Sequence, residues 1–539
     1  MMMDVPLTIS SMIERAEKLF AKKEIISRTH STITRLTYKE LGERTRRLSS
    51  ALQKLGVKQG ERVGTLAWNH HRHVEAYFAI PGIGAVLHTI NIRLSPQHIS
   101  FIIQHAEDRV LLIDEDIVPL VESIQDQLST VQAYVIMTDK KELPPTSLQP
   151  VYHYETLLEE GDPSFSFIQN IDEHMPAGMC YTSATTGNPK GVVYTHRSTV
   201  LHSMTLGLAD TTALSESDIA MPIVPMFHVN AWGLPFAATW FGSNLVLPGP
   251  MFTPKILLEM IEEEKVTIAA GVPTIWLGVL QELEKNRYDL SNMKRILCGG
   301  SAAPKSVIAA FEQKYNVPFV HAYGMTETSP LVTLARLKSY QCELPYEEQL
   351  TIRAKQGYLI PGVEMKVIGE NGDVAWDGQE MGELCLRAPW IAASYYNDER
   401  TVEGFRDGWL YTGDVVTVDE EGSIKIVDRT KDVIKSGGEW ISSVDLENAL
   451  MAHEAIFEAA VVAVPHKQWQ ERPVACVVVK QNKSVTKEEL YDFLKPQFAK
   501  WWLPDEIVFM KEIPKTSVGK FLKQALRKEL EQYYIEDRK

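Results

Sequence analysis

Short apolar runs alternate with amphipathic segments through the first part of the chain. The leucines of residues 36–56 fall on one helical stripe that ends at Gly56, and the apolar run 62–68 follows. This order predicts a helix and then a buried strand. Further strands are predicted at 109–114, 133–139, 266–273 and 295–302, and a further helix at 253–265. Strands that alternate with helices are typical of an α/β protein with a large mixed or parallel sheet.

The pattern changes after about residue 360. Residues 362–374, 382–389 and 415–429 read as strands and hairpins, with "NGD" and "EEGS" at the turns. We therefore predict a smaller β subdomain at about 355–429.

Past residue 430 an α/β pattern returns. Helices are predicted at 442–453 and 486–499, and strands at 458–464 and 473–481. A compact C-terminal domain of about 110 residues fits the usual size of domains. The chain of 539 residues is longer than one hydrophobic core usually supports, so more than one domain is expected.

Composition narrows the function classes. The 55 Lys and Arg residues against 70 Asp and Glu give a net charge of -15, which disfavours a nucleic acid or an anionic membrane as partner. The 5 cysteines are scattered and form no CxxC pair, which argues against a disulfide framework or structural zinc. The start of the chain resembles no signal peptide, no apolar run approaches a membrane span, and the last residues are no peroxisomal address. We expect a cytoplasmic enzyme without a transmembrane segment.

One stretch, "YTSATTGNPKGVVYTH" at 181–196, gathers hydroxyls, a flexible backbone and a cation. Main-chain N–H groups and hydroxyls bond phosphate oxygens, and lysine neutralises their charge, so the stretch is typical of a phosphate-binding loop. It is not the GxxxxGK[ST] type, because Gly191 follows Lys190. A plain turn rich in Gly and Thr is the alternative. The residues concerned are Thr182, Ser183, Ala184, Thr185, Thr186, Gly187 and Lys190.

Five other stretches carry candidate chemistry, although each alone is also typical of an ordinary loop, linker or core segment. The stretch 321–330 offers an aromatic ring, Tyr323, for stacking on a purine and a carboxylate, Glu327, for Mg²⁺. Asp414, which we expect at a turn, is suited to accept hydrogen bonds from ribose hydroxyls. His228 and Trp232 are four residues apart, the spacing of one helical face. The last two stretches are 428–440, with charge and two glycines, and 514–523, with Lys520 after a glycine.

In this order the stretches resemble the adenylate-forming superfamily of acyl-CoA synthetases, luciferases and nonribosomal peptide synthetase adenylation domains. The resemblance covers nearly the whole chain, and "MFHVNAW" and "IKSGGEWIS" are similar to the fatty-acyl-CoA synthetase branch. It implies an N-terminal AMP-binding domain at 1–429, a hinge at about 430–432 and a mobile C-terminal domain at 430–539. It also implies a ligase of fatty acid and lipid metabolism.

The resemblance implies that a carboxylic acid attacks the α-phosphorus of ATP, which gives acyl-AMP and pyrophosphate. The loop from Thr182 to Lys190 would grip the β- and γ-phosphates, and Glu327 with Thr182 would hold Mg²⁺. Thr326 would contact the α-phosphate, and Lys520 would bridge the carboxylate and the α-phosphate. Asp414 and Arg429 would hold the ribose. The adenine would lie against Tyr323 and the residues Gly300, Ser301, Ala302, His321, Ala322, Gly324 and Met325.

The second half-reaction would transfer the acyl group to the thiol of coenzyme A. By resemblance the C-terminal domain rotates about Lys431, so that one site runs both reactions. The loop that would then enter the site comprises Lys435, Ser436, Gly437, Gly438, Glu439 and Trp440. Its glycines let the backbone approach the pantetheine arm.

His228, Val229, Trp232 and Gly324 are expected near the acid, with Trp232 similar to a gate at a fatty-acid tunnel. A medium- or long-chain fatty acid is favoured, and a short or functionalised acid such as a thioether propionate is the alternative. An enzyme that loads a carrier protein, a luciferase-like oxygenase and a nucleotide sensor without enzymatic activity are further rivals. Many relatives have glycine at Ala184, so we expect φ below zero or mild strain there and a modest effect on ATP affinity. The resemblance is also compatible with a homodimer.

Overall fold

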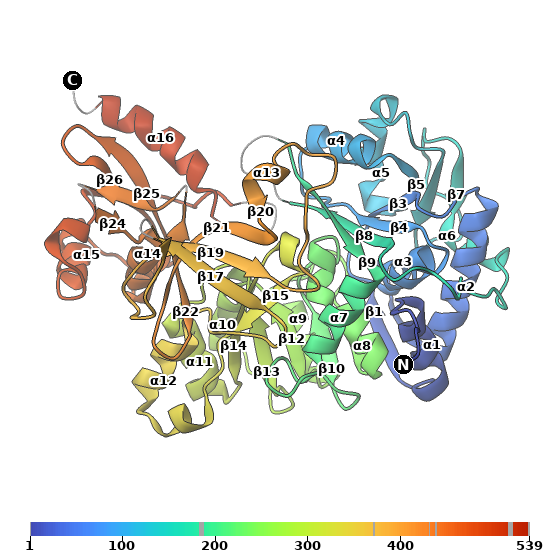
Figure 1. The fold of residues 1–539 in the computed structure, drawn as a ribbon, viewed down its shortest axis with the longest axis horizontal. Coiled ribbons are helices and arrows are strands. Elements are labelled where there is room, and N and C mark those ends of the chain that lie inside the picture. The colour runs from blue at the N-terminus through green and yellow to red at the C-terminus, as the bar shows by residue number, and fades with distance from the viewer. Residues whose placement is uncertain are drawn as a thin grey trace.

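Two large sheets carry the N-terminal part of the chain (Figure 1). The computed structural model describes residues 2–182, 188–369, 372–430, 432–436, 439–515 and 521–536. The first sheet has 7 strands, parallel except at its last pair, in the order β7 (Val151–His153), β6 (Ala133–Met137), β5 (Asp108–Asp114), β3 (Arg62–Leu66), β4 (Val86–Thr89), β8 (Pro176–Tyr181), β9 (Gly191–Thr195).

The second sheet has 9 strands, with a parallel centre and antiparallel pairs at both ends. Its order is β16 (Tyr358–Leu359), β15 (Leu331–Leu334), β14 (Phe319–Gly324), β13 (Arg295–Cys298), β12 (Ile268–Gly271), β10 (Ile219–Pro222), β11 (Asn244–Leu247), β1 (Glu24–Arg28), β2 (Ile33–Thr37).

Helices connect and cover these strands. They are α1 (Ser10–Leu19), α2 (Tyr38–Lys54), α3 (His71–Gly82), α4 (Pro96–Ala106), α5 (Val118–Glu122), α6 (Tyr154–Glu159), α7 (His196–Leu206), α8 (Leu234–Phe241), α9 (Pro254–Glu263), α10 (Pro273–Lys285), α11 (Lys305–Tyr315) and α12 (Tyr346–Arg353). The start of α2 shows how the sequence sets a boundary: Thr37 accepts a hydrogen bond from the backbone of Glu40, and the Glu40 carboxylate accepts one from Thr37 in return.

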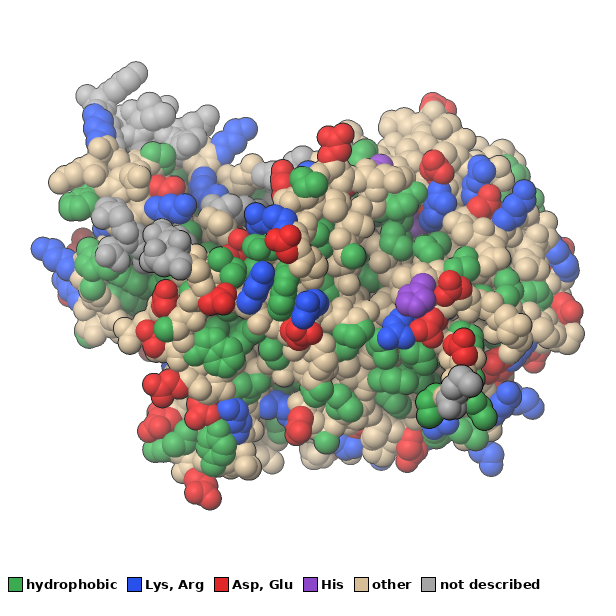
Figure 2. Space-filling view, viewed as in Figure 1, with side chains coloured by type: hydrophobic (Ala, Val, Ile, Leu, Met, Phe, Trp, Pro, Cys, Tyr) green, Lys and Arg blue, Asp and Glu red, His purple; other side chains and the backbone are tan. Residues whose placement is uncertain are grey.

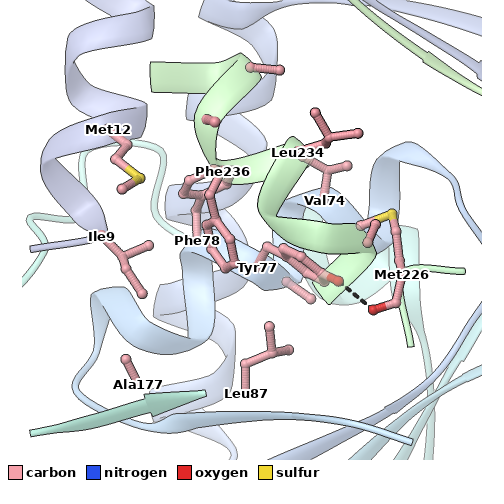
Figure 3. Packing of buried hydrophobic residues seen from close by; sticks show 14 of the residues in the cluster. Ile9, Met12, Val74, Tyr77, Phe78, Leu87, Ala177, Met226, Leu234 and Phe236 are labelled. Carbon is pink, nitrogen blue, oxygen red and sulfur yellow. Dashed lines mark hydrogen bonds between the residues drawn. The ribbon is translucent and has the colours of Figure 1, made fainter. Parts of the chain in front are cut away.

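The main hydrophobic core joins the two sheets through helices that lie against both of them. Val74, Tyr77 and Phe78 of α3 meet Leu234 and Phe236 of α8, as Figure 3 shows. Helix α3 contacts β3, β4 and β8 of the first sheet, whereas α8 contacts β10 and β11 of the second. The Tyr77 hydroxyl donates to the carbonyl of Met226, which satisfies a polar group inside this core. The two sheets are therefore held as one body.

A third, antiparallel sheet forms the predicted β subdomain and lies between the large sheets and the C-terminal part (Figure 1). It runs β18 (Gly372–Asp373), β17 (Glu364–Gly369), β19 (Gly382–Arg387), β21 (Trp409–Val418), β20 (Phe405–Arg406), with β22 (Ile424–Arg429) paired to β21 and helix α13 (Thr401–Gly404) beside it.

The C-terminal part has a sheet of its own and two small cores. Its strands run β24 (Glu439–Ile441), β23 (Ile434–Ser436), β26 (Gln470–Val479), β25 (Ile456–His466), with β27 (Glu506–Phe509) on β26 and helices α14 (Ser443–Ala452), α15 (Lys487–Leu494) and α16 (Lys523–Glu536). The α/β fold class, with a large N-terminal domain, a β subdomain and a small C-terminal domain, is thus confirmed. The residue numbers of the domain boundaries stay a prediction.

Three local predictions are wrong. Asp414 lies inside strand β21, not at a turn. The strand continues through this region because Gly413, with a φ of 71°, accommodates the shift in register between β19 and β21. The helix expected over 486–499 ends at Leu494, since Pro496 has no backbone N–H to continue it. His228 and Trp232 do not share a helical face, because residues 229–232 form a left-handed turn.

The surface carries charged side chains of both signs, as the composition of the sequence leads us to expect. On the face in Figure 2, basic and acidic side chains are interspersed over all parts of the molecule. Among the described residues, no helix is both long and apolar enough to cross a membrane.

Candidate functional site

One pocket of about 790 Å³ opens where the strand ends of the second sheet, the phosphate loop and the C-terminal part meet. Cavities of this size are typical of small-molecule sites. The predicted residues that line it are Thr182, Lys190, His228, Val229, Trp232, Gly300, Ser301, Ala302, His321, Ala322, Tyr323, Gly324, Met325, Thr326, Glu327, Asp414 and Arg429. The structure therefore brings together residues that are more than two hundred positions apart.

The predicted phosphate-binding stretch lies between β8 and β9, which pair as antiparallel strands. The Thr182 N–H donates to the carbonyl of Lys190 over 2.9 Å, and the Thr182 hydroxyl accepts from the Lys190 N–H over 3.1 Å. These bonds join the two ends of the stretch, and both residues line the pocket. Ser183, Ala184, Thr185, Thr186 and Gly187 lie outside the described residues, as does the expectation for φ at Ala184.

The end of β14 supplies the opposite side of the pocket. Glu327 and Thr326 sit in a short turn after the strand and are buried, and the Tyr194 hydroxyl donates to the Thr326 carbonyl over 2.7 Å. Position 324 requires glycine for a steric reason, because a Cβ there would lie 2.0 Å from the carbonyl oxygen of Pro330. Only glycine allows β15 to return so closely past this turn.

His321 fixes the backbone beside Tyr323. Its Nδ1 lies 2.9 Å from the carbonyl oxygen of Lys355, and its Nε2 lies 3.2 Å from that of Ser301. Burial lowers the pKa of His321. The ring thus bridges β14, Lys355 and the segment 299–303, of which Gly299, Gly300, Ser301 and Ala302 line the pocket.

Asp414 is the centre of a buried polar cluster. Its Oδ1 accepts from Nε of Arg429 over 2.6 Å, and its Oδ2 accepts from the Tyr323 hydroxyl. Burial, and next the Asp414 charge, raise the pKa of Tyr323, so this phenol stays protonated. β21 and β22 hold the cluster in register because Asp414 pairs with Arg429 across the ladder. Three predicted nucleotide-binding residues are therefore preorganised as one unit.

The other end of the pocket is apolar. Trp232 is half-buried and lines the pocket, and the left-handed turn that carries it has φ of 39° at Val229, 54° at Asn230, 48° at Ala231 and 58° at Trp232. Non-glycine residues adopt this conformation at a cost of about 1 to 2 kcal/mol each. The turn is held by burial of Val229 and Ala231. The apolar lining beyond it includes Leu206, Leu234, Leu277, Leu297, Leu331 and Leu334.

The C-terminal part reaches the pocket with residues that the sequence did not single out, among them Lys523 and Arg527 of α16. Lys523 pairs with Glu447 over 2.7 Å, and Arg527 pairs with Asp432. The predicted Lys520 and Lys431 lie outside the described residues.

Of the predicted coenzyme A loop, Lys435 and Ser436 do not line the pocket. The Lys435 N–H donates to the Glu471 carboxylate over 2.9 Å, and the Ser436 hydroxyl accepts from Arg472 over 3.1 Å, both within the C-terminal sheet. Gly437 and Gly438 are outside the described residues, and only the backbone of Glu439 and Trp440 is described.

The donor set fits a metal–nucleotide complex. Mg²⁺ prefers oxygen ligands and commonly takes one or two protein groups together with phosphate oxygens. The carboxylate of Glu327 and the hydroxyl of Thr182 are such groups and face the same pocket. Lys190 adds positive charge there, although burial lowers its pKa.

Two contributors escaped the sequence analysis. Tyr395 contacts both Glu327 and Lys190, and Arg400 donates to the carbonyl of Asn188 in the phosphate loop over 3.0 Å. Both lie in "SYYNDER", a stretch without a recognisable local signal, and reach the site only through the fold.

Comparison with known proteins gives a consistent result. The family described as AMP-binding enzyme matches residues 13–396, and the family described as AMP-binding enzyme C-terminal domain matches residues 445–520. A long-chain-fatty-acid–CoA ligase of Thermus thermophilus is 52% identical over 99% of this chain and 97% of its own length. A 3-methylmercaptopropionyl-CoA ligase of Ruegeria lacuscaerulensis is 45% identical over 98% of each chain, and a medium-chain-fatty-acid–CoA ligase of Ectopseudomonas oleovorans is 42% identical over 98% and 96%.

Among solved structures, the anthranilate CoA ligase AuaEII in complex with anthranoyl-AMP superimposes with a TM-score of 0.88 at 24% identity, covering 99% of both chains. At this identity the likeness shows the shared fold.

Proposed function

Because this chain belongs to the AMP-binding enzyme family and is an AMP-forming acyl-CoA ligase, we propose that it activates medium- or long-chain fatty acids. ATP and coenzyme A are the other substrates of such a ligase. The observation that carries the acid class is the apolar part of the pocket lining, to which leucine side chains from separate elements contribute together with Trp232. Apolar surface of this kind favours a hydrocarbon chain over a charged or strongly polar tail.

The first reaction joins two anions. A carboxylate oxygen of the acid attacks the α-phosphorus of ATP, the bond to the bridging oxygen breaks, and pyrophosphate leaves with the electron pair. Thr182 and Lys190 would bind the leaving phosphates, and Thr326 would bind the α-phosphate. These groups would stabilise the negative charge that develops in the transition state. Lys520 would neutralise the acid and the α-phosphate together. Glu327 and Thr182 would hold Mg²⁺, which, when bound, supplies charge neutralisation of the phosphates.

Asp414, Arg429 and Tyr323 would position the nucleoside. Asp414 is held by two donors in this structure, so its carboxylate is oriented before a ribose hydroxyl arrives. Tyr323 and the backbone of 299–303 would enclose the base, and His321 would keep that backbone in place.

The second reaction forms a thioester. The thiol of coenzyme A loses its proton, its sulfur attacks the acyl carbon, and AMP leaves with the acyl–oxygen electron pair. We propose that the 435–440 loop, of which Lys435 and Ser436 bond to the C-terminal sheet in this structure, enters after a rotation at Lys431, and that His228 lies near the reacting carbon. The domain limits 1–429 and 430–539 belong to the same proposal.

Three further attributes complete it. Mg²⁺ dependence follows from the oxygen donors at Glu327 and Thr182. A cytoplasmic location fits the free cysteines, of which four are buried. A homodimer remains part of the proposal on the resemblance alone.

A second candidate is an acid with a short thioether chain, such as 3-methylmercaptopropionate, since a 45% identical relative is named for the corresponding ligase. The half-buried Trp232 favours it if the indole closes the pocket to long chains.

The test is pyrophosphate release by the purified protein with ATP and Mg²⁺ across straight-chain acids from acetate to oleate and 3-methylmercaptopropionate, with and without coenzyme A. We expect acid-dependent release that accelerates with coenzyme A and peaks at a medium or long chain. A peak at the thioether acid would establish the second candidate. Acid-dependent pyrophosphate release that does not change with coenzyme A would indicate a carrier protein as the acyl acceptor. The absence of pyrophosphate release with every acid would contradict the proposal.

A further inference from the structure

Tyr395 connects two side chains that the proposed reaction needs, one for the metal and one for the phosphates. Its hydroxyl donates to Oε1 of Glu327 over 2.7 Å, and Nζ of Lys190 lies 4.0 Å from the centre of its ring. The tyrosine is buried, with 6% of its surface exposed. It therefore contacts the predicted metal ligand through its polar end and the predicted phosphate-binding cation through its ring face.

The segment 390–400 holds this ring rigidly. The Ala392 N–H donates to the Glu327 carbonyl over 2.8 Å, and the Tyr395 N–H donates to the Thr401 hydroxyl over 3.1 Å. The edge of the Phe405 ring packs against Tyr395, with centroids 5.1 Å apart. Bonds on both sides of Tyr395 thus keep its hydroxyl and its ring in one orientation.

The arrangement has an electrostatic consequence. Glu327 and Lys190 line one pocket, and within the described residues they form no ion pair. Burial lowers the pKa of Lys190, and the charge of Glu327 partly opposes this shift. An ion pair between them would neutralise both groups and would have to be broken before either could bind a metal or a phosphate. The phenol gives Glu327 a hydrogen bond, and the ring face attracts the ammonium of Lys190. Tyr395 thus stabilises the carboxylate of Glu327 and the ammonium of Lys190 without neutralising either charge.

We propose that Tyr395 is a positioning residue that keeps Glu327 and Lys190 apart and oriented for magnesium–nucleotide binding. This inference rests on the proposed function. It assigns two separable tasks: the hydroxyl orients the carboxylate for the metal, and the ring holds the lysine for the phosphates.

The chain offers a matched control. The Tyr346 hydroxyl donates to Oε2 of Glu312 over 3.1 Å, and the guanidinium of Arg353 lies 5.5 Å from the centre of that ring. This tyrosine has the same kind of partners as Tyr395, but its partners Glu312 and Arg353 are not among the pocket residues, whereas Glu327 and Lys190 are. Tyr346→Phe therefore removes an equivalent hydrogen bond elsewhere in the fold.

The experiment measures ATP binding by calorimetry, without any acid, in the presence of Mg²⁺ and in its absence. We expect Tyr395→Phe to weaken binding of ATP with Mg²⁺ by about tenfold and to raise the half-saturating Mg²⁺ concentration, because a bond to a charged group is lost. Binding of metal-free ATP should stay within about twofold, since the ring remains. Tyr395→Leu should weaken metal-free ATP as well, and Tyr346→Phe should change neither.

Unchanged Mg²⁺ dependence in Tyr395→Phe would overturn the proposal, and so would an equal effect of Tyr346→Phe. Because the readout is binding, it is independent of the acid. A wild-type protein that binds ATP with Mg²⁺ but releases no pyrophosphate with any acid would contradict the proposed function and leave the role of Tyr395 to be judged from the variants.

Discussion

The two ends of the pocket are built by different forces. At the nucleotide end, Asp414 and Glu327 are each tied to a tyrosine hydroxyl, and Asp414 also to Arg429. At the proposed acyl end, Leu206 and Leu334 line the space with apolar side chains. Directional bonds orient groups and favour one ligand, whereas apolar contacts limit volume and discriminate weakly between neighbouring chain lengths. We therefore expect changes at the nucleotide end to alter rate and ATP affinity, and changes at the acyl end to alter the choice of acid.

The largest effect should follow Glu327→Gln. The amide keeps the size of the side chain and can still accept from Tyr395, but it loses the charge that Mg²⁺ requires. We expect acid-dependent pyrophosphate release to fall by about 100-fold or more, as for removal of one transition-state stabiliser. The acid of highest rate should not change. A shift of the preferred acid at nearly normal rate would contradict the division between the two ends.

Asp414→Asn should have the next largest effect. The change weakens the contacts with Arg429 and Tyr323 and with a ribose hydroxyl, so KM for ATP should rise by about 10- to 100-fold. Initial rates at varied ATP and saturating acid measure this. KM for the acid serves as the internal control and should stay within about twofold. An equal rise of both constants would show that the mutation disturbs the whole pocket.

Trp232→Ala tests the acyl end. Removing the indole opens the entrance to the apolar space, so the ratio of kcat/KM for a long acid to that for a short acid should rise by about tenfold. KM for ATP should be unchanged. If the ratio falls instead, the indole forms part of the wall that contacts long chains.

The smallest effect concerns pH and stability at the acyl end. Burial lowers the pKa of His202 from 6.5 to about 3, and its Nε2 accepts from the Leu331 N–H over 3.1 Å. The unfolded chain binds the proton more readily, so this stabilisation is present above pH 6.5 and is lost as the pH falls toward 3. The contribution is up to about 1.4 kcal/mol per pH unit.

Thermal unfolding midpoints of His202→Gln should therefore fall less steeply between neutral pH and about pH 5 than those of the wild type. His174→Gln, at an exposed position, is the matched control and should leave the slope unchanged. Identical slopes for wild type and His202→Gln would contradict the neutral buried histidine.

Local sequence identified the polar residues of the pocket more readily than its apolar residues. Hydroxyls, glycines and charges stand close together in 181–196 and 321–330, so the chemistry is visible before the fold is known. The helices and strands of the α/β parts were also predictable, because periodicity reports which face is buried. Asp414 was misplaced to a turn because the bulge at Gly413 leaves no separate signal.

The residues of the proposed acyl end could not be predicted from local sequence. Leu206 and Leu334 belong to α7 and β15, and only the packing of the two elements makes them neighbours of one cavity. The left-handed turn at 229–232 contains residues that rarely adopt positive φ, so propensity argues against it. Tyr395 was missed for the related reason that its partners, Glu327 and Lys190, lie in distant parts of the chain.

The most direct test of the division is the double variant Asp414→Asn with Trp232→Ala. Asp414 and Trp232 share no hydrogen-bond partner among the residues that the structure describes, so their effects should add. KM for ATP and the ratio of kcat/KM between a long and a short acid would be measured in the wild type, both single variants and the double variant. The account predicts a double variant that combines both single effects within about twofold, or about 0.5 kcal/mol. A double variant that differs from the combined single effects by tenfold or more, about 1.4 kcal/mol, would contradict the account. It would show that the binding of the nucleotide and the binding of the acid are energetically coupled.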